Sequence, residues 1–242
     1  MSAENQRAFG MAAMGAFSLP GPKQAADPAR HQGPDPRPEA RRAFVAGMDA
    51  LLDHSGALYW PAQHTLVVSD LHLETGSSYA RTGQMLPPYD SAVTLARLAE
   101  VTSHYAPRRI ISLGDSFHDP FGAERLSPEN VATLMAIIGN AEIIWITGNH
   151  DQASAARFGG EAHDEYSLAG VTYRHIPTEG DVHSPEVAGH LHPVARVPMR
   201  GRMVRRRAFV GCALRLVMPA FGCLTGGSCL SATTQGTVLA DP

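Results

Sequence analysis

Four short motifs of this sequence carry aspartate, asparagine and histidine residues at spacings that could bind metal ions. Each follows a short apolar run, and in chain order they are Asp70-Leu71-His72, Gly114-Asp115, Gly148-Asn149-His150-Asp151 and Gly189-His190-Leu191-His192. Alone, the last motif is equally consistent with a pair of structural histidines. Together, the carboxylate, amide and imidazole groups suit first-row divalent metals such as Mn, Fe or Zn better than calcium, which prefers oxygen ligands.

The candidate ligands are too many for one tetrahedral zinc ion. They are Asp70, His72, Asp115, Asn149, His190 and His192. Two metals roughly 3.5–4 Å apart, with one shared carboxylate, would use the whole set. Such a pair clamps a phosphate group and lowers the pKa of bound water, so the motifs predict phosphoester chemistry.

Alternating strands and helices must bring these motifs together. The apolar runs 65–69, 109–113 and 143–146 predict buried strands, and helices are predicted from Asp90 and from Ser127-Pro128 between them. This alternation predicts parallel strands with helical crossovers. In such sheets the ligand site lies beyond the carboxyl ends of the strands, which is where the first three motifs fall.

The later third of the chain predicts short strands without helices. The runs are 171–173, 194–197, 208–210 and 214–218. We interpret them as the second sheet of a layered sandwich, and the earlier runs 57–60 and 65–69 as a hairpin. The fold class predicted is therefore α/β, a sandwich of two sheets with helices.

Length and composition indicate one globular domain in a chain of 242 residues. Residues 1–42 are rich in Ala, Gly, Pro and polar residues and predict a disordered leader, which leaves 43–242 as the domain. A net charge of −3 gives no global attraction to nucleic acid, so such a partner needs a local patch. No apolar run is long enough for a membrane span. Three cysteines without metal-type spacing favour reduced thiols in a cytoplasmic protein.

The four motifs, in this order between residues 65 and 193, resemble the signature of the calcineurin-like metallophosphoesterase superfamily. Further stretches are similar to the bacterial DNA-ligase-associated metallophosphoesterases: 56–61, 71–74, 76–78, 86–90, 114–119 and 188–193. The resemblance implies two mixed β-sheets flanked by helices. It also implies a phosphodiesterase or nuclease that acts on DNA in repair, beside an ATP-dependent DNA ligase and a helicase.

Residue by residue, the resemblance implies that Asp70, His72 and His192 hold the first metal. Asn149 and His190 would hold the second, and Asp115 would bridge the two. The second metal needs one more histidine, for which His163, His175 and His183 are available; we predict His175, because it ends a predicted strand. Two divalent cations are expected, with manganese preferred over iron, zinc or nickel.

The resemblance also implies that His150 contacts the phosphate and protonates the leaving oxygen, with Asp151 orienting its ring. Arg81 and His118 are candidate substrate contacts, with a plain surface role for Arg81 and a supporting role for His118 as the alternatives. Arginines crowd residues 196–207, either as a phosphate-binding patch or as an exposed hairpin with solvated charges.

Two other functions are compatible with the motifs. One is a phosphatase or phosphodiesterase that acts on small nucleotides. The other is a metal-binding adaptor with weak turnover in a repair complex, although an adaptor would not need His150.

Overall fold

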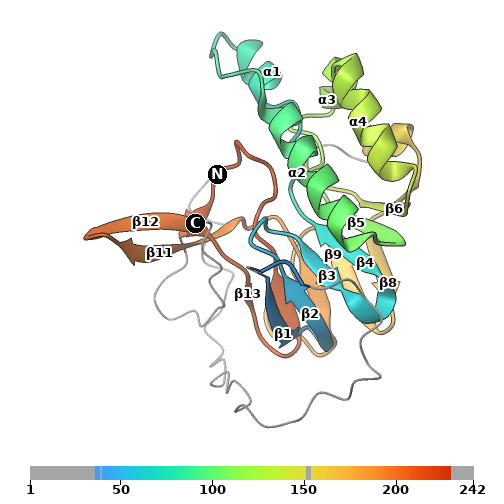
Figure 1. Cartoon of the computed structure of the whole chain (residues 1–242), viewed down its shortest axis with the longest axis vertical. Coiled ribbons are helices and arrows are strands. Elements are labelled where there is room, and N and C mark those ends of the chain that lie inside the picture. The colour runs from blue at the N-terminus through green and yellow to red at the C-terminus, as the bar shows by residue number, and fades with distance from the viewer. Residues whose placement is uncertain (1–35, 39, 151–153, 230–242) are drawn as a thin grey trace.

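A seven-stranded sheet forms the centre of the fold (Figure 1). The computed structural model describes residues 36–38, 40–150 and 154–229, and most of the predicted leader 1–42 lies outside these residues. In spatial order the strands are β1 (Arg41–Val45), β2 (Met48–Leu52), β3 (Leu58–Trp60), β4 (Thr65–Val68), β5 (Arg109–Leu113), β6 (Glu142–Ile146) and β7 (Glu161–His163). Neighbours from β1 to β4 are antiparallel, and those from β4 to β7 are parallel.

Helices connect the parallel strands, as the sequence predicts. The α-helices are α1 (Thr75–Ala80), α2 (Asp90–Tyr105), α3 (Gly122–Arg125) and α4 (Pro128–Ile138), and two short 3-10 helices are η3 (Pro61–Gln63) and η4 (Ser154–Phe158). At the start of α4 the Ser127 hydroxyl accepts a hydrogen bond from the Asn130 amide, and Pro128 occupies the first turn. No helix in the described part of the chain is long and apolar enough to cross a membrane.

A second, five-stranded sheet packs against the first. Its spatial order is β13 (Val210–Gly211), β14 (Arg215–Val217), β10 (Glu186–Ala188), β9 (Val171–Arg174) and β8 (Glu165–Leu168). The three inner strands are parallel, whereas β8 and β13 are antiparallel to their neighbours. Both sheets are therefore mixed, and the predicted sandwich is confirmed.

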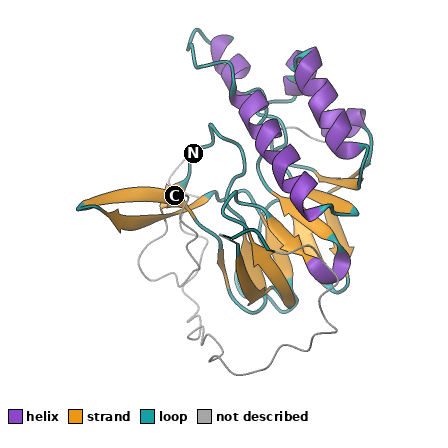
Figure 2. Cartoon of the chain, viewed as in Figure 1, coloured by secondary structure: helices purple, strands orange, loops and turns teal. Residues whose placement is uncertain are grey.

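The core follows the alternation of side chains along the central strands. Leu66 and Ile110 pack with the apolar face of α2, while Val67 and Ile111 pack with the second sheet. Successive side chains of a strand point to opposite faces. Because both faces are covered, these strands are apolar throughout, as expected for buried parallel strands. Figure 2 shows the α-helices gathered on one side of the strands.

One element departs from the prediction that 194–197 belongs to the second sheet. Strand β11 (Pro193–Met199) pairs instead with β12 (Arg202–Arg207) and with β15 (Ser228–Cys229) in a separate sheet. The β11–β12 hairpin projects from the body (Figure 1). Its strands carry arginines on both faces, and burying several charged side chains in a sandwich interior would cost free energy. The charge pattern therefore excludes these strands from the core.

A buried ion pair holds β10 to β14. The Arg215 guanidinium donates from Nε to Glu186 Oε1, and both side chains are buried. Replacing Arg215 with Met should lower the free energy of unfolding by about 3 kcal/mol, because Oε1 of the buried Glu186 loses its charged donor, while Oε2 keeps the hydrogen bond from the Thr178 hydroxyl. The measurement is urea denaturation of both proteins.

The matched control for this prediction is Arg109→Met, which removes the partner of the more exposed Glu142. Exposed pairs contribute at most about 1 kcal/mol. Equal destabilisation by the two substitutions would contradict the special role of the buried pair.

Candidate metal centre

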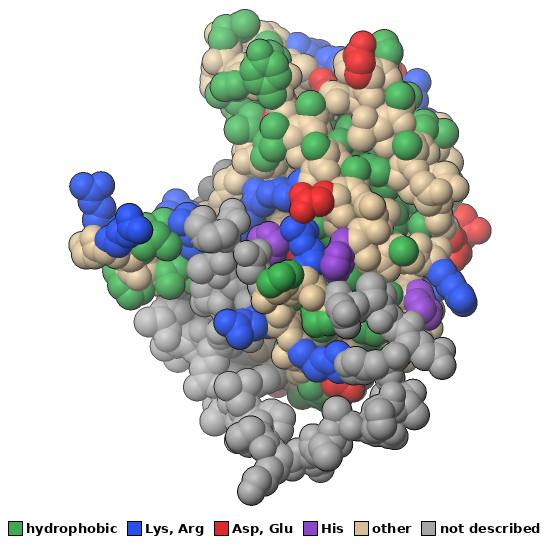
Figure 3. Space-filling view, in the orientation of Figure 1, with side chains coloured by type: hydrophobic (Ala, Val, Ile, Leu, Met, Phe, Trp, Pro, Cys, Tyr) green, Lys and Arg blue, Asp and Glu red, His purple; other side chains and the backbone are tan. Residues whose placement is uncertain are grey.

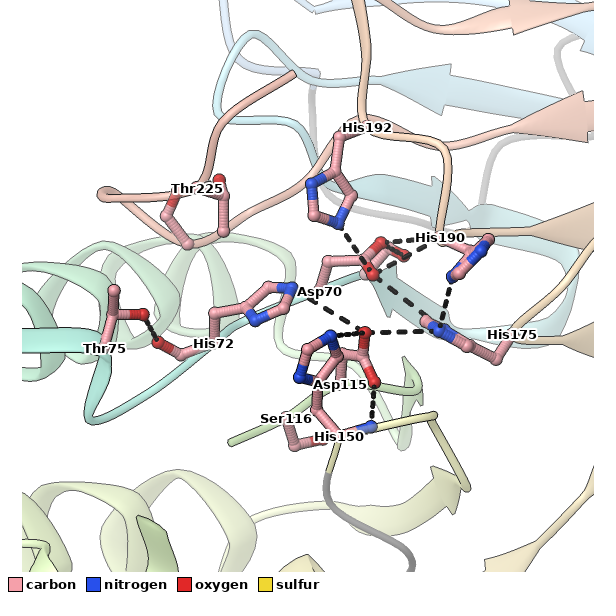
Figure 4. Close-up of polar contacts among 12 residues, drawn as sticks. Asp70, His72, Thr75, Asp115, Ser116, His150, His175, His190, His192 and Thr225 are labelled. Carbon is pink, nitrogen blue, oxygen red and sulfur yellow. Dashed lines mark hydrogen bonds and ion pairs between the residues drawn. The ribbon is translucent and has the colours of Figure 1, made fainter. Parts of the chain in front are cut away.

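Six of the seven predicted ligand residues, all except Asn149, meet where parallel strands of both sheets end (Figure 4). Asp70 follows β4, Asp115 follows β5, and His175 follows β9, while His190 and His192 follow β10. Two groups have ligand atoms within 4.8 Å of one another: Asp70, His72 and His192 form one, and Asp115, His175 and His190 form the other. Residues far apart in the sequence, such as Asp70 and His192, are thus brought to one place.

The Asp115 carboxylate lies between the two groups. Its Oδ2 is 3.3 Å from Nε2 of His175 in its own group and 3.8 Å from Nε2 of His72 in the other. In the first group, His192 Nε2 is 3.0 Å from Asp70 Oδ1. Among the described ligand candidates, Asp115 is therefore placed to serve both groups.

Backbone carbonyls orient two of the histidines. Nδ1 of His175 is 2.9 Å from the carbonyl oxygen of Leu113, and Nδ1 of His192 is 3.2 Å from that of Gly226. A proton on Nδ1 that is donated to a carbonyl leaves Nε2 free as a ligand, which is the usual arrangement of metal-binding histidines. In both residues Nε2 points to a carboxylate of the same group.

Five of the candidate ligand residues have an uncommon backbone conformation. Positive φ angles occur at Asp70 (51°), His72 (43°), Asp115 (46°), His190 (68°) and His192 (45°). Left-handed conformations are rare for residues other than glycine and cost free energy, and they gather at functional sites. Sharp turns directly after the strands therefore aim these side chains into the shared space.

The glycines of the motifs permit the close approach of neighbouring loops. A Cβ at Gly148 would overlap the amide nitrogen and a carboxylate oxygen of Asp115. A Cβ at Gly189 would overlap the Ser69 hydroxyl and lie 2.7 Å from Oδ2 of Asp70. At both positions the glycine packs directly on a candidate ligand residue of a neighbouring loop, and only a residue without a side chain fits there.

The two carboxylates attract positive charge. Burial by itself would raise the pKa of Asp115, but the hydrogen bond and charge of His175 outweigh it and hold that pKa well below its usual range. Burial also opposes the charged form of His175, yet the hydrogen bond to Asp115 and the charge of Asp70 raise the pKa of His175 to about 9. The carboxylates therefore remain ionised at neutral pH and favour a cationic neighbour.

His72 provides the most direct test of whether a metal fits. Its side chain is 7% exposed, and neither ring nitrogen has a hydrogen-bond partner in the part of the chain that the structure describes. Buried polar atoms normally have partners. Burial lowers the pKa of His72 to about 4, so the ring is neutral at pH 7, the form that binds metals. Two carboxylates and four histidines in these two groups fit divalent first-row cations.

The third motif lies at the edge of this cluster. The backbone amide of His150 donates to Asp115 Oδ1 at 2.9 Å, and the His150 side chain is 49% exposed. Asn149 is exposed on the same loop, between Gly148 and His150. Asp151 lies outside the described residues. A half-exposed imidazole beside the ligands is accessible to a substrate, while the roles of Asn149 and Asp151 remain predictions.

Of the three histidines considered for the second metal, one lies in the cluster of candidate ligands and two do not. His175 is buried in the cluster, where its Nε2 is 3.1 Å from Nδ1 of His190. His163 instead lies 3.0 Å from Glu161 on β7, and His183 is exposed. The geometry thus favours His175, and its role as a ligand remains a prediction.

Of the two candidate substrate contacts, only His118 lies beside the ligands. Its ring stacks on His150, with centroids 5.7 Å apart, and is 5.5 Å from the ring of His72. Burial and the charge of His150 lower the pKa of His118. The Arg81 guanidinium lies over the Phe121 ring, 5.8 Å from its centroid. The structure therefore supports a site role for His118 more directly than for Arg81.

Sequence reasoning missed the residues that support the His118 loop. Arg125 donates two hydrogen bonds to Asp119, at 3.0 and 2.6 Å, and a third from Nε to the Ser77 hydroxyl. This guanidinium fixes the loop that carries His118 to α1. The acidic partner, Asp119, directly follows His118 in the sequence, but nothing in the sequence points to Arg125 as its partner.

Comparisons with known proteins agree with this geometry. The sequence model of the calcineurin-like phosphoesterase family matches residues 64–201, more than half of the chain. No curated protein matches. The crystal structure of Pseudomonas putida nuclease MPE is similar, with 28% identity, 81% of this chain and 94% of that chain covered, and a TM-score of 0.65. A protein of unknown function from Aquifex aeolicus, AQ665, matches at 18% identity over 47% of this chain and 60% of that chain, with a TM-score of 0.35.

The family match includes all four motifs, and the solved nuclease shares the fold over most of both chains. The chain therefore belongs to the calcineurin-like phosphoesterase family and is a metal-dependent phosphoester hydrolase.

Proposed function

We propose that this protein is a dinuclear-metal-dependent phosphodiesterase that cleaves DNA. The observation that carries the proposal is the pair of ligand groups with Asp115 between them and the half-exposed His150 beside them. The DNA substrate is supported by the likeness to Pseudomonas putida nuclease MPE, which extends over most of both chains.

In the proposed site, Asp70, His72 and His192 would hold one cation. His175, His190 and Asn149 would hold the other, and Asp115 would contribute to both. Two divalent cations held by these residues would neutralise the charge of a phosphate and lower the pKa of bound water. Manganese is our preferred metal, because imidazole and carboxylate together suit it, while iron, zinc and nickel are accepted by the same donors.

The chain's own residues then bind and orient the substrate. His150 faces the site from the loop after β6, where its amide is held by Asp115. We assign to its ring the contact with a phosphate oxygen and the transfer of a proton to the leaving oxygen. His118 stacks on the His150 ring and limits its orientations. Asp151 remains our candidate for a further orienting group.

A substrate panel tests this function. Purified protein with added manganese should hydrolyse bis-(p-nitrophenyl) phosphate and single-stranded DNA faster than the monoester p-nitrophenyl phosphate. A chelator should abolish all three activities, because the proposed nucleophile is a water molecule whose pKa the two cations would lower. Preference for the monoester or for free nucleotides would support the small-nucleotide alternative instead. Metal analysis of the purified protein identifies the cation.

The proposal includes a role in DNA repair beside an ATP-dependent DNA ligase and a helicase, in the cytoplasm. Its support is the resemblance of the motif flanks, such as 86–90 and 114–119, to the ligase-associated proteins. The adaptor alternative would be favoured if a catalytically inactive variant kept both its partners and its function in cells.

A further inference from the structure

One segment of this chain has a net positive charge that no acidic residue offsets. Between Val187 and Ala240 there are seven arginines and no aspartate or glutamate, which leaves 13 Lys and Arg against 23 Asp and Glu in the remainder. One of the seven, Arg215, is buried against Glu186. The other six lie on the β11–β12 hairpin: Arg196, Arg200, Arg202, Arg205, Arg206 and Arg207.

The base of this hairpin is attached to the metal centre. Strand β11 begins at Pro193, directly after the candidate ligand His192, whose ring contacts the carbonyl of Gly226. The hairpin packs on the same loop, because Arg205 donates to the carbonyl of Gly227 and Arg207 to that of Gly222. Seven extended residues then reach roughly 20 Å from the centre to the tip. The hairpin is thus a fixed arm, and Figure 3 shows its outer end lined with basic side chains.

The exposed arginines are held in positions that cost stability. Arg196 lies directly opposite Arg205 in the ladder, and like charges in such pairs repel. At the tip, Arg200 and Gly201 have φ angles of 47° and 77°, as in a type I′ turn, where Asn or Gly is the favoured first residue. The stability of the fold does not explain why arginine occupies these positions. An anionic ligand does.

The residue types specify the chemistry of that ligand. Every basic residue of the hairpin is arginine, whose planar guanidinium binds phosphate oxygens in a bidentate manner. Residues 193–207 contain no aromatic side chain on which a base could stack. In a duplex each strand presents a phosphate about every 3.4 Å along the helix axis. Phosphates lie further apart in an extended single strand, but an arm of this length still reaches more than one. The arm therefore suits the sugar–phosphate backbone and not particular bases.

We propose that the β11–β12 hairpin is a nucleic-acid-binding arm that holds the phosphodiester backbone of a DNA strand as it enters the metal centre. The proposal rests on the function proposed above. It adds the route by which the DNA strand reaches the metal centre, which is along the hairpin. The arm binds without sequence preference, and its contribution to binding weakens as the salt concentration rises.

The test compares wild-type protein with the variant Arg196→Gln/Arg200→Gln/Arg202→Gln. These three side chains are exposed, and the arginines that donate to the 222–227 loop are left in place. Binding of a labelled mixed-sequence single-stranded DNA is measured by fluorescence anisotropy in chelator across a salt series. At 0.1 M salt, three lost phosphate contacts should weaken binding roughly 100-fold and reduce the salt slope by about 2.

The control variant Arg41→Gln/Arg42→Gln/Arg108→Gln changes the net charge equally at exposed positions outside the hairpin. It should bind DNA within about twofold of wild type if the arm, and not net charge, is responsible. An equal loss in both variants, or no loss in the hairpin variant, overturns the proposal.

Hydrolysis of bis-(p-nitrophenyl) phosphate with manganese is the second readout, because this diester is too small to span the centre and the arm. The ratio of DNA cleavage to small-diester hydrolysis should fall with DNA affinity in the hairpin variant. A parallel loss of both activities would assign the arginines to the fold and overturn the proposal. Wild-type protein that binds DNA through the arm but cleaves none would contradict the proposed function while supporting the arm.

Discussion

Replacing Asp115 with asparagine should reduce manganese-dependent hydrolysis of bis-(p-nitrophenyl) phosphate by roughly 10²–10³-fold or more. The substitution would keep the size of the side chain and an acceptor for the His150 amide, which now donates to Oδ1. It would remove the charge that faces His72 and His175 from the two ligand groups. Metal ions contribute several kcal/mol to the reaction, and each 1.36 kcal/mol is a tenfold change in rate.

Metal content provides an independent readout for the Asp115 variant. If Asp115 serves both groups, Asp115→Asn should bind less metal per chain than wild type at the same free manganese concentration. Asp49→Asn, at an exposed position on β2, removes the same charge away from the site and should match wild type in both assays. Activity within a few-fold of wild type in the Asp115 variant would exclude the bridging role.

The positions of Asp70 and Asp115 at the edge of the sheet could be predicted from the sequence, because each follows a strand whose apolar character is readable. The run Arg109–Leu113 is apolar enough to predict β5, and Asp115 follows it at the edge where parallel strands end. The order of the four motifs then supplied the resemblance that the family match confirms. These strands are buried on both faces and are therefore continuous apolar runs, which can be recognised in the local sequence.

Other parts of the site depend on contacts that no local pattern reveals. Strand β10 has only three residues, too few for a periodic signal, although it carries the His190 motif. The carbonyls of Leu113 and Gly226, which orient His175 and His192, belong to residues whose types say nothing about that role. The pairing of Arg125 with Asp119 arises from the packing of α3 beside α1. Tertiary structure alone supplies these groups.

Replacing Gly114 with alanine should disrupt the centre without changing any candidate ligand. Gly114 precedes Asp115 and has a φ of +75°, and an added Cβ would lie 2.8 Å from Cβ of His175 and overlap its imidazole ring. The ring cannot move aside freely, because it is buried and bound to the Leu113 carbonyl and to Asp115. We expect a loss of roughly 100-fold in activity, as a misplacement of about 1 Å in a site can cause.

The control substitution Gly170→Ala distinguishes the effect of the overlap with His175 from the effect of backbone strain. Gly170 has a φ of +84° in the turn between β8 and β9, and a Cβ there would meet nothing within 4 Å. Both variants therefore share the cost of a left-handed alanine, about 1–2 kcal/mol of unfolding free energy. Only Gly114→Ala adds the displacement of His175, so activity and metal binding should fall in that variant alone. If the two variants lose stability equally and both keep full activity, the close packing of Gly114 on His175 does not position the metal ligands.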